Sequence, residues 1–267
     1  MGRLDAKVAV IVGGASGFGL ATAERFAAEG ATVAVVGRRG DLAVEAGARL
    51  GGSGHGCDIT DFDAVDRTTA EIVARHGRVD VAVNYAGFEQ STPIRDLTPA
   101  TWQPMIDVQL TGAVWFLRAM ANQMADQPQP GGSVISISSL TAHNPAAGQA
   151  AYAGAKKALE YITEIAAVEY GLAGVRVNAI APHLIETPMT ADIFKLAFVV
   201  EAVRLQTPLG RMGHVDDVAN AALFLASDEA GYISGQTIRV DGAASMQKLP
   251  TTEEFGLLAK HRPDLLS

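Results

Sequence analysis

The sequence predicts an α/β protein built on one doubly wound parallel sheet of about seven strands, with helices on both faces. Short runs rich in valine and isoleucine alternate along the chain with stretches of helical periodicity. Runs that are apolar throughout are typical of strands buried on both faces, and repeated strand–helix–strand units require right-handed crossovers and a parallel sheet. No long linker, repeat or low-complexity tract divides the chain, so residues 1–267 are expected to form a single domain.

The expected strands are short, and most of them end in Gly, Asn or Ser. They are predicted at residues 7–12, 32–37, 54–59, 79–87, 132–138, 175–181 and 237–242, of which 54–59 is the weakest.

Helices are expected between these strands, at residues 17–29, 41–50, 61–76, 98–126, 150–171 and 215–227. Their starts are marked by capping side chains, a first-turn proline or an acidic pair, at Asp61, Thr98–Pro99 and Asp216–Asp217. Glycines mark their ends at Gly30, Gly77 and Gly171. Two regions, 183–210 and 243–267, break the alternation.

The composition limits the classes of function. The chain has 267 residues, of which 48% are hydrophobic, and its mean hydropathy of +0.17 predicts a large buried core. Its 29 acidic residues outnumber its 21 basic ones, so no broad positive surface is offered to nucleic acid. The single cysteine, Cys57, excludes an intramolecular disulfide and a multi-cysteine metal site, and we expect it to be a small apolar filler. The six histidines form no HExxH motif, and no metal is expected.

No membrane partner is expected either. No stretch reaches about 18 uninterrupted apolar residues. Asp5 and Lys7 interrupt the amino-terminal run "MGRLDAKVAVIV" where a signal peptide would be apolar. We therefore expect a cytoplasmic protein.

The first expected strand leads into a glycine-rich turn, "VIVGGASGFGLATAERF", in which Gly13, Gly17 and Gly19 are spaced G-x-x-x-G-x-G. Glycines at such a turn leave room for a pyrophosphate and let the helix pack on the sheet, while the free N–H groups of the helix start attract an anion. The turn therefore predicts a dinucleotide site of the Rossmann fold, to which Ser16 and Phe18 would also contribute. The alternative is a tight turn that binds nothing.

Tyr152 and Lys156 stand four residues apart in "AAYAGAKKALEY" and would share one face of the expected helix. A tyrosine with a pKa of about 10 is a poor base at neutral pH, whereas an ammonium group within a few ångströms stabilises its phenolate. Such a pair is able to exchange a proton with an alcohol or carbonyl substrate. The alternative is an amphipathic helix with a solvated Lys156. The neighbouring Lys157 is expected in solvent, and Tyr161 is expected to pack.

Several motifs in this order resemble those of a short-chain dehydrogenase/reductase. They are the glycine turn, "NYAG" at 84–87, Ser139 thirteen residues before Tyr152, the Tyr152–Lys156 pair and "NAIAPHLIETPM" from Asn178. The resemblance covers about residues 5–242. It implies that Tyr152 is the general acid or base, that Ser139 holds the substrate oxygen and that Lys156 binds the nicotinamide ribose. Ser138 would face the opposite side of the strand, and the spacing of the family selects Ser139.

The resemblance also implies a homotetramer or homodimer and a set of cofactor contacts. Asp58 and Ile59 resemble the pair that contacts adenine, although Asp58 also fits a structural role. The remaining implied contacts are Asn84, Ala86, Gly87, Pro182, Ile185 and Thr187.

The choice of cofactor depends on the end of the second strand, where an acidic residue normally accepts hydrogen bonds from the ribose of NAD(H). Gly37 stands there, and Arg38 and Arg39 follow. The missing acid removes repulsion of a 2′-phosphate, and either arginine is able to bind it. NADP(H) is therefore favoured, with NAD(H) as the alternative. The arginines would otherwise be loop charges paired with Asp41 or Glu45.

Five positions depart from the family pattern. Gln109 replaces a catalytic asparagine thought to hold a relay water, and it carries the same amide on a longer arm, so the relay is either kept or lost. Tyr85 replaces the second Asn of "NNAG", Val12 a threonine, His183 a glycine and Ala243 the second glycine of "DGG". Of these, Gln109 is a catalytic candidate, and His183 is either a substrate contact or a packing residue.

The segment 183–210 is implied to be a mobile lid over the substrate. Its apolar side chains, including Phe194 and Phe198, predict a hydrophobic or alicyclic alcohol or ketone. The alternative is an apolar helix buried against the body of the protein or another subunit. The extension 243–267 either covers a neighbouring subunit's site or has no such role. Two functions remain: an NADP(H)-dependent oxidoreductase with a small-molecule carbonyl or alcohol substrate, or a dinucleotide-binding sensor or scaffold with little or no catalysis.

Overall fold

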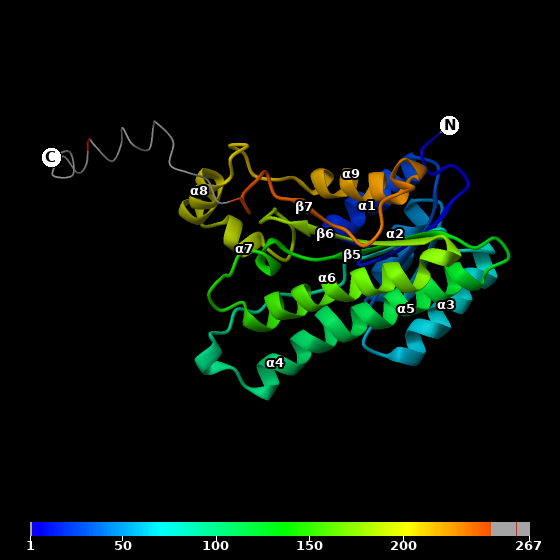
Figure 1. The fold of residues 1–267 in the computed structure, drawn as a ribbon, viewed down its shortest axis with the longest axis horizontal. Helices are drawn as coiled ribbons and strands as arrows, with labels where there is room; N and C mark the ends of the chain where they lie inside the picture. The colour runs from blue at the N-terminus through cyan, green and yellow to red at the C-terminus, as the bar shows by residue number, and fades with distance from the viewer. Residues whose placement is uncertain (1, 247–259, 261–267) are drawn as a thin grey trace.

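The computed structural model describes residues 2–246 and residue 260, and it confirms the predicted fold class. Within this part of the chain, seven parallel strands form one sheet in the order β3-β2-β1-β4-β5-β6-β7 (Figure 1). The strands are β1 Val8–Val12, β2 Thr32–Gly37, β3 Ser53–Gly56, β4 Val81–Asn84, β5 Gly132–Ile137, β6 Val175–Pro182 and β7 Thr237–Val240.

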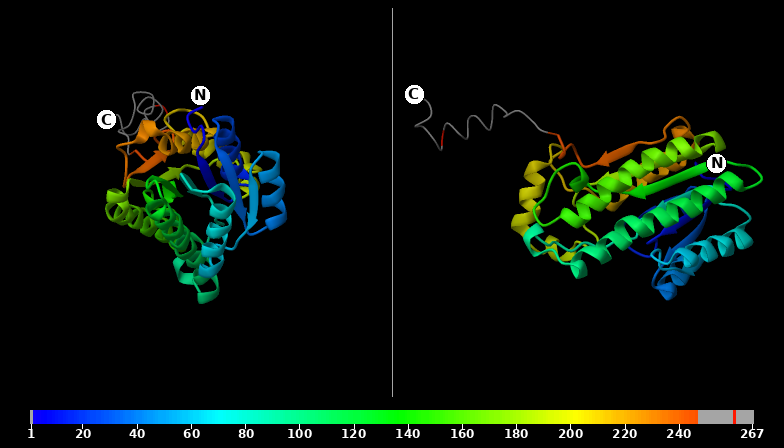
Figure 2. Two further views of the ribbon diagram at one scale, coloured as in Figure 1. Left: turned by 90° about the vertical axis from the view of Figure 1, so that its right-hand side faces the viewer. Right: turned by 60° about the horizontal axis from the view of Figure 1, so that its bottom comes forward.

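The helices connect these strands and lie on both faces of the sheet (Figure 2). They are α1 Gly17–Ala28, α2 Gly40–Arg49, α3 Phe62–His76, α4 Pro99–Ile106, α5 Ala113–Asp126, α6 Ala150–Tyr170, α7 Ala191–Phe194, α8 Ala197–Gln206 and α9 Val215–Ala226. None of the helices of the described residues combines the length and apolar character needed to traverse a bilayer.

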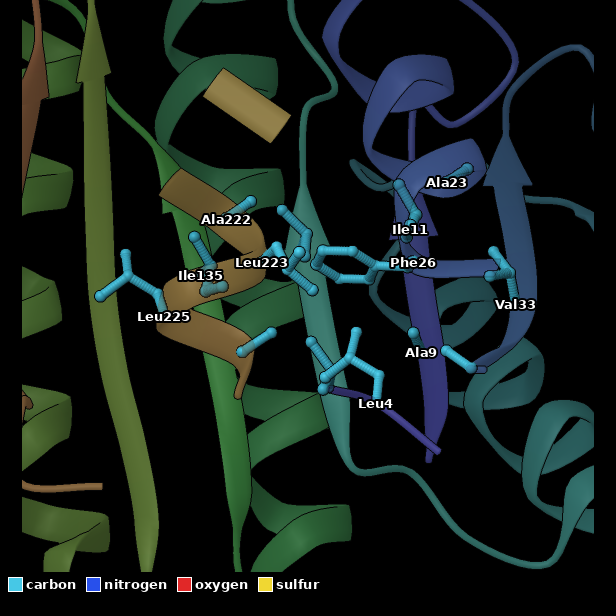
Figure 3. Close-up of a cluster of buried hydrophobic side chains, with 14 of the residues drawn as sticks. Leu4, Ala9, Ile11, Ala23, Phe26, Val33, Ile135, Ala222, Leu223 and Leu225 are labelled. Carbon is cyan, nitrogen blue, oxygen red and sulfur yellow. The ribbon is translucent and has the colours of Figure 1, made fainter. Parts of the chain in front are cut away.

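Two hydrophobic cores lie on opposite faces of the sheet, because successive strand residues point to opposite sides. One core packs α1, α2 and α9 against Ile11 and Ile135, with Phe26 of α1 beside Leu223 of α9 (Figure 3). The other packs α3, α5 and α6. Cys57 is buried in this second core, as expected for an apolar filler.

Most helix start and stop signals act as predicted. Asp61 Oδ1 accepts a hydrogen bond from the backbone N–H of Ala64 at 2.9 Å, and Gly77 ends α3 with φ +85°. The predicted acidic pair Asp216–Asp217 lies in the first turn of α9, whose cap is His214. Gly171 directly follows the last residue of α6, as predicted, and the chain then continues as a 3₁₀ turn and reverses at Gly174, where φ is +73°.

The predicted helix at 98–126 is interrupted. Between α4 and α5, Asp107–Gly112 forms a turn of π-helix. Its residues are compatible with an α-helix, so the sequence carries no signal for the wider turn. Single turns of π-helix inside α-helices are frequently found at functional sites.

The predicted strand at 79–87 is also shorter in the structure and ends at Asn84. The Asn84 side chain accepts a hydrogen bond from the backbone N–H of Ala86 at 2.9 Å, which replaces strand pairing with a loop.

Candidate active site

The site lies at the carboxyl ends of the central strands. β1 and β4 are neighbours although the chain passes through β2 and β3 between them, so the connections on the two sides of this pair run in opposite directions. Such a switch point opens a crevice in which parallel α/β proteins bind their ligands. The loops after β1, β4, β5 and β6, which carry most of the predicted site residues, all leave the sheet at this edge because the strands are parallel.

The glycine turn after β1 has the geometry of an anion site. Gly13 and Gly17 adopt φ values of +74° and +52°, which only glycine takes without strain. A side chain at Gly19 would lie 2.2 Å from the Gly13 carbonyl oxygen, so the helix packs against the turn only because Gly19 has none. Ser16 caps α1 without a side-chain hydrogen bond to any described residue, which leaves the first N–H groups for a ligand.

Tyr85, whose role the sequence left open, packs against this turn. Its hydroxyl lies 2.8 Å from Thr22 Oγ1, and its ring packs 6.2 Å from the ring of Phe18. Burial raises the pKa of Tyr85 well above its usual value. Tyr85 is therefore a neutral structural side chain.

The turn also contacts the loop after β6. The closest atoms to an imagined side chain at Gly17 belong to Thr187, at 3.5 Å, so these two predicted cofactor residues lie together. Thr187 N–H donates to Thr190 Oγ1 at 2.9 Å, which folds the loop back on itself. Pro182 ends β6 and Ile185 is buried in the core, so a cofactor would meet only the backbone of Ile185.

The end of β2 is open. No atom lies within 4 Å of an imagined side chain at Gly37, and Arg38 and Arg39 are both exposed. Arg39, which precedes the first residue of α2, forms no capping side-chain hydrogen bond among the described residues. Neither arginine forms an ion pair with Asp41 or Glu45 in this part of the chain, so that alternative is not what the structure contains. Space, positive charge and free N–H groups fit a phosphate here.

Next to it, Asp58 accepts hydrogen bonds from the Thr60 backbone at 3.0 Å and from the Thr60 hydroxyl at 2.8 Å. These bonds give Asp58 the structural role named as the alternative. Ile59 is buried against Gly112, where a side chain would lie 2.8 Å away.

Ser139, Tyr152 and Lys156 come together at the end of β5. Ser139 follows the strand in extended conformation, and its Oγ accepts a hydrogen bond from Thr141 N–H at 3.2 Å. Lys156 is buried, donates from Nζ to the Ile137 carbonyl at 2.8 Å and lies 5.6 Å from the centre of the Tyr152 ring. The α6 helix therefore presents the predicted pair to the end of the strand, as the four-residue spacing requires.

The electrostatics of this group differ from the prediction. Burial raises the pKa of Tyr152, the nearby Ser139 hydroxyl opposes the rise, and the charge of Glu89 adds to it. Burial also lowers the pKa of Lys156 to about 7. Lys156 lies beside the Tyr152 ring as predicted, but burial opposes the predicted fall of the Tyr152 pKa and leaves Lys156 itself partly neutral.

Glu89 was missed by the sequence reasoning. Gln149, three residues before Tyr152, donates from Nε2 to Glu89 Oε1 at 2.6 Å, and Thr92 N–H donates to the Gly148 carbonyl at 2.8 Å. These bonds join the loops after β4 and β5. The only available signal was an acidic residue shortly after "NYAG".

Gln109 lies in the π turn and is buried. Its Nε2 donates to the Phe88 carbonyl, and both of its amide atoms lie within 3 Å of an imagined side chain at Gly87. Its Oε1 has no partner among the described residues. A buried acceptor without a donor is suited to a water or a ligand group.

The three predicted substrate contacts, His183, Phe194 and Phe198, differ in burial. His183 is half-buried, its N–H donates to the Val240 carbonyl at 3.1 Å, and burial lowers its pKa. Phe194 is half-buried, whereas Phe198 is 74% exposed. Helices α7 and α8 lie beyond the carboxyl ends of β5–β7 (Figure 1).

The remaining expectations have mixed outcomes. No residue of α8 is buried, so α8 is not buried against the body of the protein, whereas burial against another subunit stays a prediction. Lys157 is exposed as expected, but Tyr161 is 65% exposed among the described residues and so is not packed as predicted. Ala243 adopts φ +70°, which explains why glycine is usual there. The extension at 243–267 lies largely outside the described residues.

Comparison with known proteins extends the resemblance. The family described as "Enoyl-(Acyl carrier protein) reductase" matches residues 13–245. The 3-oxoacyl-[acyl-carrier-protein] reductase FabG of Thermotoga maritima is 36% identical over 249 residues, which are 90% of this chain and 98% of that protein. The 2,5-dichloro-2,5-cyclohexadiene-1,4-diol dehydrogenase LinX of Sphingobium indicum is 36% identical over 249 residues, which are 91% and 98% of the two chains.

A solved structure gives the same result. The short-chain type dehydrogenase/reductase from Mycobacterium ulcerans superposes with a TM-score of 0.86 and 34% identity, over 97% of this chain and 95% of that one. A family match over most of the chain and this level of identity agree with the sheet order and the assembled Ser139, Tyr152 and Lys156. The chain therefore belongs to the short-chain dehydrogenase/reductase family and is an oxidoreductase that acts on CH–OH or C=O groups.

Proposed function

We propose that the protein is an NADP(H)-dependent oxidoreductase that interconverts a hydrophobic or alicyclic ketone and its secondary alcohol, with Tyr152 as general acid and base. The observation that carries the proposal is the approach of Ser139, Tyr152 and Lys156 at the end of β5, beside the anion-binding turn after β1.

The role of each residue in this reaction follows from the chemistry of its side chain. Ser139 would hydrogen-bond the substrate oxygen and fix it near the phenol of Tyr152. Tyr152 would give a proton to that oxygen during reduction and remove one during oxidation. Lys156 would hold the ribose hydroxyls. When Lys156 is protonated, its charge beside the Tyr152 ring favours the Tyr152 phenolate. When bound, the nicotinamide supplies or accepts the hydride.

Preference for NADP(H) is supported by the open space at Gly37 and by the exposed Arg38 and Arg39. A carboxylate at this position would repel a 2′-phosphate, whereas a guanidinium group binds phosphate with two parallel hydrogen bonds. Arg38→Ala together with Arg39→Ala should weaken NADPH binding and leave NADH binding little changed. Equal losses for both nucleotides in calorimetry would contradict this assignment.

An apolar substrate is supported by the side chains of the segment over the site. Phe198, Val199 and Val200 lie on α8, beyond the sheet edge that carries Ser139. The name of the Sphingobium relative refers to a cyclohexadiene diol, which is an alicyclic alcohol.

A homotetramer or homodimer is supported by apolar side chains on the outer face of α6. Tyr161, Ile165, Val168 and Leu172 are all exposed there or at its end, an unusual concentration for a surface in contact with water. Light scattering would measure the assembly. The cytoplasmic location stays a prediction, which cell fractionation would test.

The decisive experiment is a panel of cyclic and linear ketones with each coenzyme, followed by nicotinamide absorbance. We expect turnover with NADPH and higher kcat/KM for bulky cyclic ketones than for small polar ones. Tyr152→Phe should abolish turnover while calorimetry shows unchanged NADPH binding. NADPH binding without turnover of any ketone or alcohol would favour the sensor or scaffold function instead.

A further inference from the structure

The carboxylate of Glu160 on α6 contacts both ends of the turn that carries Ser139. Glu160 Oε1 accepts a hydrogen bond from Ser138 Oγ at 2.6 Å and lies 2.9 Å from His143 Nε2. Its other oxygen, Oε2, accepts from Lys157 Nζ at 3.0 Å. The Glu160 side chain is 4% exposed, and hydrogen bonds to a carboxylate shielded from water are strong.

The turn between these anchors is short. Ser139 caps the start of the 3₁₀ turn Leu140–Ala142, and His143 caps its end. Ser138 immediately precedes it. The Ser139 hydroxyl is therefore carried by a segment whose two ends meet the same carboxylate oxygen.

The α6 helix aligns Glu160 with the candidate site. Tyr152, Lys156 and Glu160 are four residues apart in turn, so they form one stripe along the helix. Lys156 Nζ donates to the carbonyl of Ile137, the residue before Ser138. The helix thus holds the end of β5 at two successive residues, and it carries Tyr152 on the same stripe.

A cavity of about 530 Å³ opens on this cluster from the side of β7. Its lining consists of His143, Lys157, Glu160, Glu164, Ala167, Val168 and residues 234–237. Among the described residues, Ser139, Tyr152 and Lys156 are not part of that lining. The contacts of Glu160 therefore lie outside the surface where substrate is expected, and changes to Glu160 can be separated from changes to binding.

We propose that Glu160 is a positioning residue for Ser139, an inference that rests on the proposed function. By bonding to Ser138 and to His143, it fixes both ends of the turn so that the Ser139 hydroxyl is directed at the substrate oxygen beside Tyr152. A purely structural Glu160 would instead support the fold as a whole. The two roles differ because positioning acts through the Ser139 hydroxyl alone.

The test compares Glu160→Leu, which removes the acceptor at similar volume, with Glu160→Gln, which keeps Oε1 for Ser138 and His143. Glu160→Leu should lower kcat for ketone reduction roughly tenfold, part of the 10²–10³ that one oxyanion donor is worth, with NADPH affinity nearly unchanged. Glu160→Gln should restore most of the rate. Glu164→Leu, one turn along the helix at an exposed position, is the control and should have no effect.

A double-mutant cycle separates positioning from a general structural effect. In a Ser139→Ala background, Glu160→Leu should cause no further loss of kcat, because the group it positions is gone. A loss of the same factor in both backgrounds overturns the proposal. If Glu160→Leu does not fold, Ser138→Ala removes one of the same bonds and enters the cycle in its place.

Hydrogen exchange provides a readout that needs no turnover. Glu160→Leu should speed exchange at the amides of Ala142 and His143, which bond within the turn, and leave those of residues 133–137 unchanged. Unchanged exchange in the turn overturns the inference. If the wild-type protein reduces no ketone while the exchange result holds, the turn is anchored as inferred and the proposed function fails.

Discussion

At the scale of single residues, the surroundings of Tyr152 determine its chemistry more than its spacing from Lys156 does. The spacing correctly predicted that the two side chains lie on one helix face. It could not predict the pKa values, because these depend on burial and on Glu89, which comes from a loop about 60 residues earlier in the chain. Long-range contacts of this kind leave no local pattern in a sequence.

The charge of Glu89 should be visible in the pH dependence of oxidation. Glu89→Gln keeps an acceptor for Gln149 but removes a negative charge that disfavours the phenolate, so the pKa of Tyr152 falls. The acidic limb of the profile of kcat/KM against pH should move to lower pH. Glu169→Gln, near the far end of α6, removes an equal charge and should leave the limb in place. A shift to higher pH would show that Glu89 does not act through charge.

Lys156 should couple nucleotide binding to a proton. Burial lowers its pKa to about 7, and hydrogen bonds from its ammonium group to ribose hydroxyls would raise that pKa. Binding near pH 7.5 should therefore take up a fraction of a proton. Calorimetry in phosphate and in Tris, which differ in ionisation enthalpy, measures this uptake. Lys156→Met should abolish it, and equal enthalpies in both buffers for the wild type would rule the coupling out.

At the scale of elements, the sequence predicted those whose signals are local. The capping residues Asp61 and Thr98 lie where the helices begin, and the apolar runs became strands. The π turn around Gln109 was not predictable, since its residues also suit an α-helix and the contact of the Gln109 side chain with the Phe88 carbonyl is brought about only by the fold. Glu160 was overlooked for the opposite reason: its spacing from Tyr152 is regular, but its partners Ser138 and His143 are brought to it only by the fold.

The packing of α3 on β3 should depend on pH. Ser53 Oγ lies 2.7 Å from His76 Nε2 and 3.0 Å from His55 Nε2, in a nearly buried position. Burial, with the charges of Arg75 and His55, lowers the pKa of His76. The unfolded chain then binds a proton near the ordinary pKa of about 6.5 that the folded chain does not yet bind, so the free energy of unfolding falls as pH drops below that value.

Urea denaturation at pH 7.5 and pH 5.5 measures this loss. His76→Gln removes the titrating group and should make the difference between the two pH values smaller. An unchanged difference would assign the acid sensitivity to other groups.

At the scale of the whole molecule, the sequence predicted a parallel sheet between helices but not the order of its strands. Buried runs around Ile11 and Ile135 indicated a parallel sheet, yet the neighbours of each strand depend on long-range packing, such as that of α1 against α9 and of α3 against α5, which leaves no local pattern. The apolar sequence of α8 was ambiguous in the same way, because apolar side chains suit a buried helix and a binding surface equally. In the structure Phe198 is exposed.

Substitutions of two phenylalanines should distinguish the buried core from the exposed helix α8. Phe26→Ala removes a ring buried between α1 and α9 and should cost about 3–5 kcal/mol of unfolding free energy. The same substitution at Phe198 should change stability by less than about 0.5 kcal/mol, and it should lower kcat/KM for bulky ketones. Urea denaturation and steady-state rates measure both. Equal losses of stability would mean that α8 packs on the core in solution.

All strands of the sheet point the same way, which places the residues proposed for catalysis at one rim and leaves the chain segment before β1 at the other (Figure 1). Attaching the protein to a solid support through residues near Gly2 should consequently direct the reactive rim outward into flowing solution. An immobilised catalyst built in this orientation would keep its substrate entrance unobstructed, and its loops could be redesigned for new ketones without disturbing the tethered end.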